Sequence, residues 1–106
     1  MAYTRDEVVS ELKDLLLKLR KTHDIREAYL FGSYAKNNPS KNSDVDVALV
    51  LGNFSNGSPM DERFEIFHEV QQHNSLFEVV CLTEKEFQEA EMLLVRHIKQ
   101  EGIRIL

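Results

Sequence analysis

Residues 30–51 read LFGSYAKNNPSKNSDVDVALVL and carry the strongest structural signals in the chain. Residues 26–31 predict a short strand that ends at Gly32, and residues 33–36 predict a single helical turn. Residues 37–42 are rich in turn-forming Asn, Pro and Ser and predict a loop. From Asp44 to Leu51, apolar residues alternate with Asp44, Asp46 and Ala48, which predicts a strand. The stretch therefore predicts two strands joined by a turn and a loop.

Around this stretch the sequence predicts three helices, over residues 4–21, 60–72 and 86–100, and two further strands, over residues 77–82 and 103–106. Thr4 and Thr83 each precede a glutamate by three positions, the capping-box pattern of a helix start. Gly102 suits a helix end. The apolar stripes expected to pack are Val8, Leu12, Leu15, Leu16 and Leu19 in the first helix, and Phe64, Phe67 and Val70 in the second. This order predicts an α/β fold, with a small sheet covered by helices.

Composition limits the classes of protein that fit. A chain of 106 residues predicts one domain, residues 1–106, with a core of its own. The net charge of −5 disfavours direct binding to nucleic acid, although metal ions could still neutralise a bound nucleotide. No apolar run approaches the roughly 18 residues that a membrane span needs. The polar N-terminus is unlike a signal peptide, and the single cysteine, Cys81, fits a reducing cytoplasm.

Asp44 and Asp46 are the first candidate site residues. Residues two apart on a strand share one face, which puts these carboxylates roughly 6–7 Å apart along it. Neighbouring carboxylates repel each other, and a divalent cation removes that repulsion. Mg²⁺ favours a few carboxylates together with substrate phosphate oxygens. The aspartate pair therefore predicts a metal-binding site.

Gly32 and Ser33 provide the complementary feature. A glycine at the end of a strand lets backbone approach a ligand closely. A helical turn that begins at Ser33 would present free N–H groups, and the serine hydroxyl adds a donor. We therefore expect these two residues to hold the phosphates of a nucleotide.

Glu78 is the candidate third carboxylate. Alternation in residues 77–82 sets Glu78 on the face opposite Cys81. If this strand lies beside the strand of Asp44, three acids meet and could hold two metal ions for in-line phosphoryl or nucleotidyl transfer. Each feature alone has a plainer interpretation: Asp-x-Asp as solvated charge, Gly-Ser as an ordinary turn, and Glu78 as a polar residue on an edge strand.

The joint pattern of Gly32-Ser33, ten intervening residues and Asp44-x-Asp46 resembles the signature of the DNA polymerase β-like nucleotidyltransferase superfamily. The order of elements over nearly the whole chain resembles its minimal nucleotidyltransferase (MNT) branch. That resemblance implies a mixed, palm-like sheet, two Mg²⁺ ions and ATP as substrate. It also implies that Gly32 and Ser33 hold the triphosphate, and that Asp44, Asp46 and Glu78 serve as metal ligands and catalytic groups. Glu78 stands where the family most often has aspartate, and Lys36-Asn37 where many members have Arg-Gly.

Many small MNT proteins resemble antitoxins that transfer AMP to a tyrosine of a HEPN-domain ribonuclease toxin. The resemblance implies such a partner here, because the sequence shows no second domain that would hold another acceptor. One alternative is a non-catalytic antitoxin or binding module that neutralises its partner by contact. Another is a nucleotidyltransferase for small molecules, in which a homodimer supplies the missing wall.

Other polar residues are expected to be structural. The four histidines are scattered, and His68 and His73 do not share a helix face, which disfavours a metal pair. Cys81 is expected to be a small buried residue rather than a nucleophile. Tyr34 is expected to pack in the core, with stacking on a nucleotide as the alternative.

Overall fold

The structure is a computed structural model that describes residues 4–36, 44–54, 58–89 and 92–106. Its helices are α1 (Arg5–Leu19), α2 (Pro59–His73), α3 (Glu84–Gln88) and α4 (Leu93–Glu101), and its strands are β1 (Ile25–Phe31), β2 (Val45–Leu51), β3 (Phe77–Thr83) and β4 (Ile103–Arg104). The loop predicted over residues 37–42 lies outside the described residues. No helix in the described ranges is long and apolar enough to cross a membrane.

The four strands form one mixed sheet in the order β3-β2-β1-β4. β1 runs antiparallel to both β2 and β4, whereas β2 and β3 run parallel. Parallel neighbours need a crossover connection, and α2 supplies it. The predicted α/β fold with a small mixed sheet is therefore confirmed.

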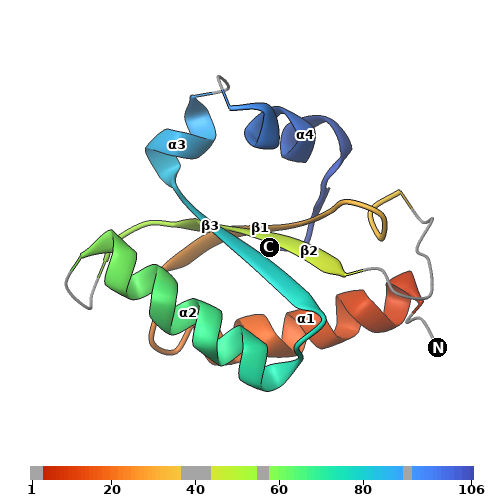
Figure 1. Ribbon diagram of the computed structural model, residues 1–106, viewed down its shortest axis with the longest axis horizontal. Coiled ribbons are helices and arrows are strands. Elements are labelled where there is room, and N and C mark those ends of the chain that lie inside the picture. The colour runs from red at the N-terminus through yellow and green to blue at the C-terminus, as the bar shows by residue number, and fades with distance from the viewer. Residues whose placement is uncertain (1–3, 37–43, 55–57, 90–91) are drawn as a thin grey trace.

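Helices cover both faces of the sheet, with α1 and α2 on one side and α3 and α4 on the other (Figure 1). The face under α1 and α2 carries Val45, Val47, Leu49 and Leu51 of β2 in one buried cluster. The opposite face carries Ala48 and Val50 in a second cluster. This division follows from the alternation of strand side chains, and it explains why nearly all of β2 is buried.

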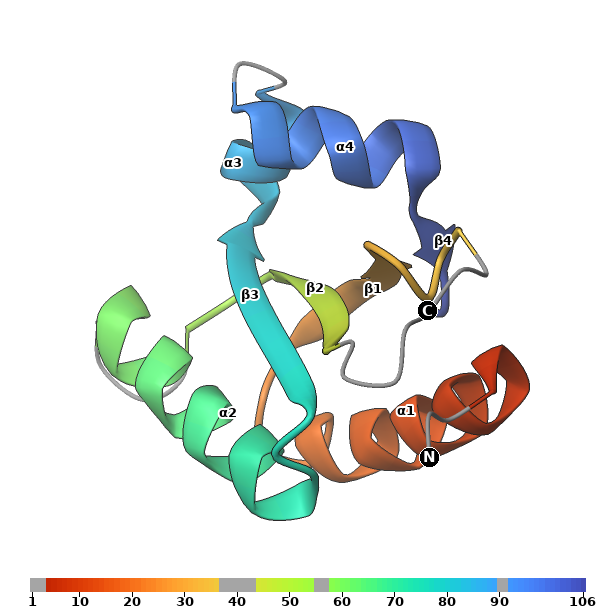
Figure 2. The ribbon, with the colours of Figure 1, turned by 45° about the vertical axis from the view of Figure 1, so that its right-hand side comes forward.

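The predicted capping boxes are confirmed at Thr4 and Thr83, where each threonine side chain accepts from the backbone N–H of a glutamate three residues on. The single helix predicted over residues 86–100 is wrong, because the chain forms α3 and α4 instead. The backbone leaves helical geometry at Glu89 and at Met92. Figure 2 shows α4 turning away from α3 and running toward β4. Phe87 of α3 and Val95 of α4 share one cluster, so the break lets both helices pack on that face.

The predicted apolar stripe of α2 is wrong for two of its three members. Phe64 and Phe67 are 59% and 46% exposed, whereas Val70 is buried as expected. The face that packs consists of Glu62, Ile66 and Val70, spaced four residues apart. The packed face of α2 therefore includes the buried Glu62 and excludes the two phenylalanines.

Two short segments differ in detail from the predictions. Residues 32–36 form a turn rather than a helix, although the Lys36 N–H donates to the Gly32 carbonyl oxygen at 3.3 Å as it would in a helical turn. The last strand is only Ile103–Arg104, but Ile105 continues beside β1, where its N–H donates to the Ala28 carbonyl oxygen at 2.7 Å.

Candidate active site

Asp44, Asp46 and Glu78 meet at one end of the β2–β3 pair. Asp44 directly precedes β2, Asp46 is the second residue of β2, and Glu78 is the second residue of β3. Asp46 and Glu78 are direct partners across the parallel ladder, so the expected neighbourhood of these strands is confirmed. Asp46 is half-buried, while Asp44 and Glu78 are exposed. Strand alternation puts Asp46 and Glu78 on the face that α3 and α4 cover.

The three carboxylates interact strongly with one another. The charge of Asp44, followed by burial and the charge of Asp46, raises the pKa of Glu78 above its ordinary value. Burial and then the charge of Asp44 raise the pKa of Asp46, and a hydrogen bond with Glu78 partly offsets this. Both directions indicate that the described residues leave the negative charge of this group incompletely compensated. A cation would compensate it, and hard oxygen ligands of this kind suit Mg²⁺, so the residues fit the expected metal.

Gly32 brings backbone directly against this group. It follows β1, whose last residue, Phe31, pairs with Asp46 in the antiparallel ladder. The φ of Gly32 is +77°, and a Cβ added there would lie 2.2 Å from Oδ2 of Asp46. Both the backbone conformation and the space therefore demand glycine at this position. A ligand held by the carboxylates would also meet the backbone of this turn.

The turn that contains Ser33 is fastened from two sides. Nε of Arg5 donates to the Tyr34 carbonyl oxygen at 3.1 Å, and the same guanidinium donates to the carbonyl oxygen of Ala35. On the other side, Nζ of Lys36 lies 3.2 Å from a carboxylate oxygen of Glu101 in α4. Sequence reasoning missed Arg5, because nothing near it in the chain marks it as a partner of the turn.

The other polar residues that the sequence raised lie away from this group or are structural. Tyr34 is 1% exposed and belongs to the core, as expected. Burial raises the pKa of the Cys81 thiol to about 12, which keeps it protonated and disfavours a nucleophilic role. Nε2 of His73 lies 3.6 Å from Glu11, and His68 is exposed, so these two histidines form no pair. His23, by contrast, is buried against Glu62, which no sequence signal indicated.

Comparison with known proteins gives one family and a consistent set of structures. The family described as polymerase beta, nucleotidyltransferase matches residues 11–106. A Methanocaldococcus jannaschii relative, provisionally named as a protein adenylyltransferase, is 32% identical over 44 residues, 42% of this chain and 47% of that protein. The aligned part thus spans less than half the length of that relative.

Three solved structures share the fold. A Sulfolobus solfataricus protein, provisionally described as a nucleotidyltransferase, matches with a TM-score of 0.64 at 17% identity over 94% of this chain and 80% of that one. A toxin–antitoxin structure with AMP-PNP matches with a TM-score of 0.63 at 20% identity over 92% and 72%. A complex of a tri-AMPylated Shewanella oneidensis HEPN toxin with its MNT antitoxin matches with a TM-score of 0.50 at 18% identity over 96% and 68%.

At these identities the structural matches establish the fold, and the family match extends over most of the sequence. Together with the carboxylates beside the Gly32 turn, they show that this chain belongs to the polymerase β nucleotidyltransferase family.

Proposed function

We propose that this chain is a Mg²⁺-dependent nucleotidyltransferase that transfers AMP from ATP to a hydroxyl group of a partner protein. The observation that carries the proposal is the meeting of Asp44, Asp46 and Glu78 on neighbouring strands. In this proposal Asp44 and Asp46 hold the metal, and Glu78 is a third ligand or the base. Gly32 and Ser33 hold the triphosphate.

The chemistry is a displacement at the α-phosphorus of ATP. The acceptor hydroxyl oxygen forms a bond to that phosphorus, the bond to the bridging oxygen of the β-phosphate breaks, and pyrophosphate leaves. When Glu78 acts as the base, its carboxylate takes the hydroxyl proton. Bound Mg²⁺ would neutralise phosphate charge during this transfer.

A HEPN-domain toxin is the proposed partner, with a tyrosine as acceptor. Support comes from the name of the M. jannaschii relative and from the similar fold of an MNT antitoxin bound to an AMPylated HEPN toxin. The toxin–antitoxin structure with AMP-PNP supports an adenine nucleotide as donor. A toxin neutralised in this way would lose its activity through modification of a side chain rather than through occupation of its surface.

A transfer assay with α-labelled ATP, Mg²⁺ and the product of the neighbouring gene, which the proposal expects to be a HEPN protein, tests the proposal. The Asp44→Asn variant should lower the rate at least about 100-fold, because it removes a metal ligand. Asp14→Asn is the matched control, since Asp14 is an exposed aspartate of α1 outside the site. Equal rates for the two variants would overturn the assignment of Asp44.

Calorimetry separates catalysis from neutralisation by contact alone. Titration of ATP into the protein with Mg²⁺ should release or absorb heat, and Asp44→Asn should abolish it. Absence of heat at millimolar ATP, together with tight binding to an unmodified toxin, would instead support a non-catalytic antitoxin. Label recovered on a small molecule rather than on protein would support the third possibility.

A further inference from the structure

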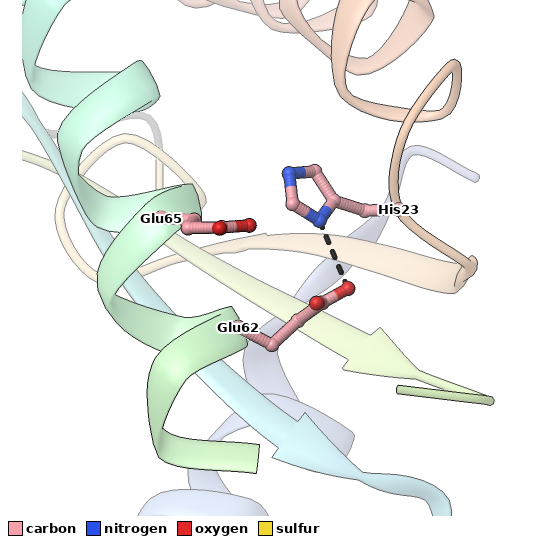
Figure 3. A group of neighbouring side chains, drawn as sticks. All are labelled: His23, Glu62 and Glu65. Carbon is pink, nitrogen blue, oxygen red and sulfur yellow. Dashed lines mark hydrogen bonds and ion pairs between the residues drawn. The ribbon is translucent and has the colours of Figure 1, made fainter. Parts of the chain in front are cut away.

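A second polar cluster lies far from the candidate active site. His23 is in the connection between α1 and β1, and Glu62 is in α2. They are only 4% and 1% exposed, and Nδ1 of His23 donates to Oε1 of Glu62 at 2.9 Å (Figure 3). Ile25, just after His23, pairs with Leu51 at the far end of β2 from Asp46. The cluster also lies on the opposite face of the sheet, the one that α2 covers.

The hydrogen bond between His23 and Glu62 leaves two buried atoms without a bond. Among the described residues, Nε2 of His23 and Oε2 of Glu62 have no hydrogen-bond partner. Oε2 of Glu69 is 3.6 Å from Nε2, which is close enough for electrostatic attraction but too far for a hydrogen bond. Buried polar atoms without a partner destabilise the folded state, so a simple ion pair is an incomplete account of the cluster.

Glu65 completes a ligand set. Glu62 and Glu65 are three residues apart on α2 and therefore share one side of the helix. His23, Glu62 and Glu65 each offer a ligand atom, and these atoms all lie within 4.8 Å of one another. Figure 3 shows the carboxylate of Glu65 directed toward the imidazole ring of His23. An open groove of about 570 Å³, lined by His23, Glu65 and Glu69 among others, connects the cluster to solvent.

We propose that His23, Glu62 and Glu65 form a second metal site, which takes a divalent transition ion of the zinc class. An imidazole nitrogen with carboxylate oxygens suits such ions, whereas Mg²⁺ prefers ligands that are all oxygen. The ion would compensate the negative charge of the two glutamates.

The ligand atoms must move closer together to hold the ion. Ligand bonds to zinc of about 2.0–2.2 Å put tetrahedral ligands roughly 3.4 Å apart. The present ligand atoms lie within 4.8 Å of one another, so the set must contract when the ion binds. Glu69, on the next turn of α2, is available as a fourth ligand. The ion would fasten α2 to the connection that leads into β1, which is a structural role independent of nucleotide transfer.

The test must separate this site from the acidic residues of the candidate active site, which would also attract Zn²⁺. Zn²⁺ is titrated by calorimetry into Asp46→Asn protein, with Mg²⁺ present in excess. One tight site should remain in this variant. Adding Glu65→Gln should weaken it at least about 10-fold, and Mg²⁺ should not displace the ion. Glu65→Gln leaves the His23–Glu62 hydrogen bond in place, so the fold is expected to persist.

His97→Gln in the same Asp46→Asn background is the matched control. His97 is exposed and its Nδ1 lies 3.8 Å from Glu101, so it represents an ordinary surface histidine beside a carboxylate. This control should bind Zn²⁺ unchanged and keep the rise in melting temperature that Zn²⁺ produces. The proposal is overturned if Glu65→Gln binds Zn²⁺ as tightly as its parent, or if His97→Gln abolishes the tight site. A Co²⁺ spectrum unaffected by His23→Gln would exclude His23 as ligand.

Discussion

The molecule has two groups of acidic side chains that differ in how their negative charge is compensated. Asp44, Asp46 and Glu78 lie at the accessible end of β2 and β3. Burial and then the charge of Asp44 raise the pKa of Asp46, and the charge of Asp44 is the main cause that raises the pKa of Glu78. Glu62 lies on the buried face of α2 and accepts a hydrogen bond from His23. Among the described residues, the first group consists of carboxylates alone, whereas Glu62 in the second has His23 as a hydrogen-bond partner, and the proposed ion would supply further compensation. The difference matches the two proposals, in which the first group acts in transfer and the second has a structural role.

The largest expected effect is on the buried group. Glu62→Ala removes a buried side chain and leaves Nδ1 of His23 without its acceptor. We expect the free energy of unfolding to fall by about 3 kcal/mol, as for other broken buried pairs. Urea denaturation measures it. A loss below 1 kcal/mol, on the same scale as a surface change, would contradict the structural role of the pair.

Gly32→Ala tests how strongly the position of the Asp46 carboxylate depends on the contact with Gly32. The positive φ should cost about 1–2 kcal/mol, and the new Cβ should displace the carboxylate of Asp46. A displacement of about 1 Å can lower a transfer rate on the order of 100-fold. Steady-state kinetics and thermal denaturation together measure both effects. A fully active variant would show that the contact between Gly32 and Asp46 is dispensable.

Glu78→Gln should stabilise the metal-free protein while it impairs transfer. A carboxyl whose pKa is raised on folding makes the folded state less stable as pH rises from about 4 through that raised value. In EDTA, the melting temperature of the parent should therefore decline over this range, and Glu78→Gln should reduce the decline. Mg²⁺ should restore the parent and have less effect on the variant. Parallel pH curves for both proteins in EDTA would contradict the repulsion.

The smallest effect is expected from Glu65→Gln in metal-free protein. Glu65 is exposed, so the free energy of unfolding should change by no more than about 0.5 kcal/mol. The contrast with Glu62→Ala would show that burial, and not the number of acidic groups, determines stability in this cluster. Denaturation with a chelator present measures it, and a change above 1 kcal/mol would remove the contrast.

Local patterns in the sequence were enough to predict that Asp46 and Glu78 lie close together. Alternation in residues 44–51 and 77–82 predicted that Asp46 and Glu78 could lie close together if their strands were neighbours. The two residues are direct partners in the parallel ladder, so this prediction is confirmed. The helix starts at Thr4 and Thr83 were equally local, because a capping box involves residues three apart. Their roles in binding and catalysis remain a proposal.

Sequence patterns gave wrong or incomplete predictions where a residue far away in the chain determines the local structure. Glu62 is buried because His23, far away in the chain, meets it, and the helix then turns Phe64 and Phe67 outward. Arg5 holds the turn after β1 through carbonyl oxygens that any residue carries, so no side-chain pattern could reveal it. The division between α3 and α4 depends on how Phe87 and Val95 fit one face of the sheet.

The parallel pairing of β2 with β3 has a consequence for how the protein folds. Asp46 and Glu78 are neighbours in the sheet, but the whole crossover through α2 separates them in the chain. Contacts between residues so far apart in the chain form late, since the entropy of closing the intervening loop must first be overcome. We therefore expect these carboxylates to come together late in folding. Their assembly would serve as a kinetic reporter for the completion of folding.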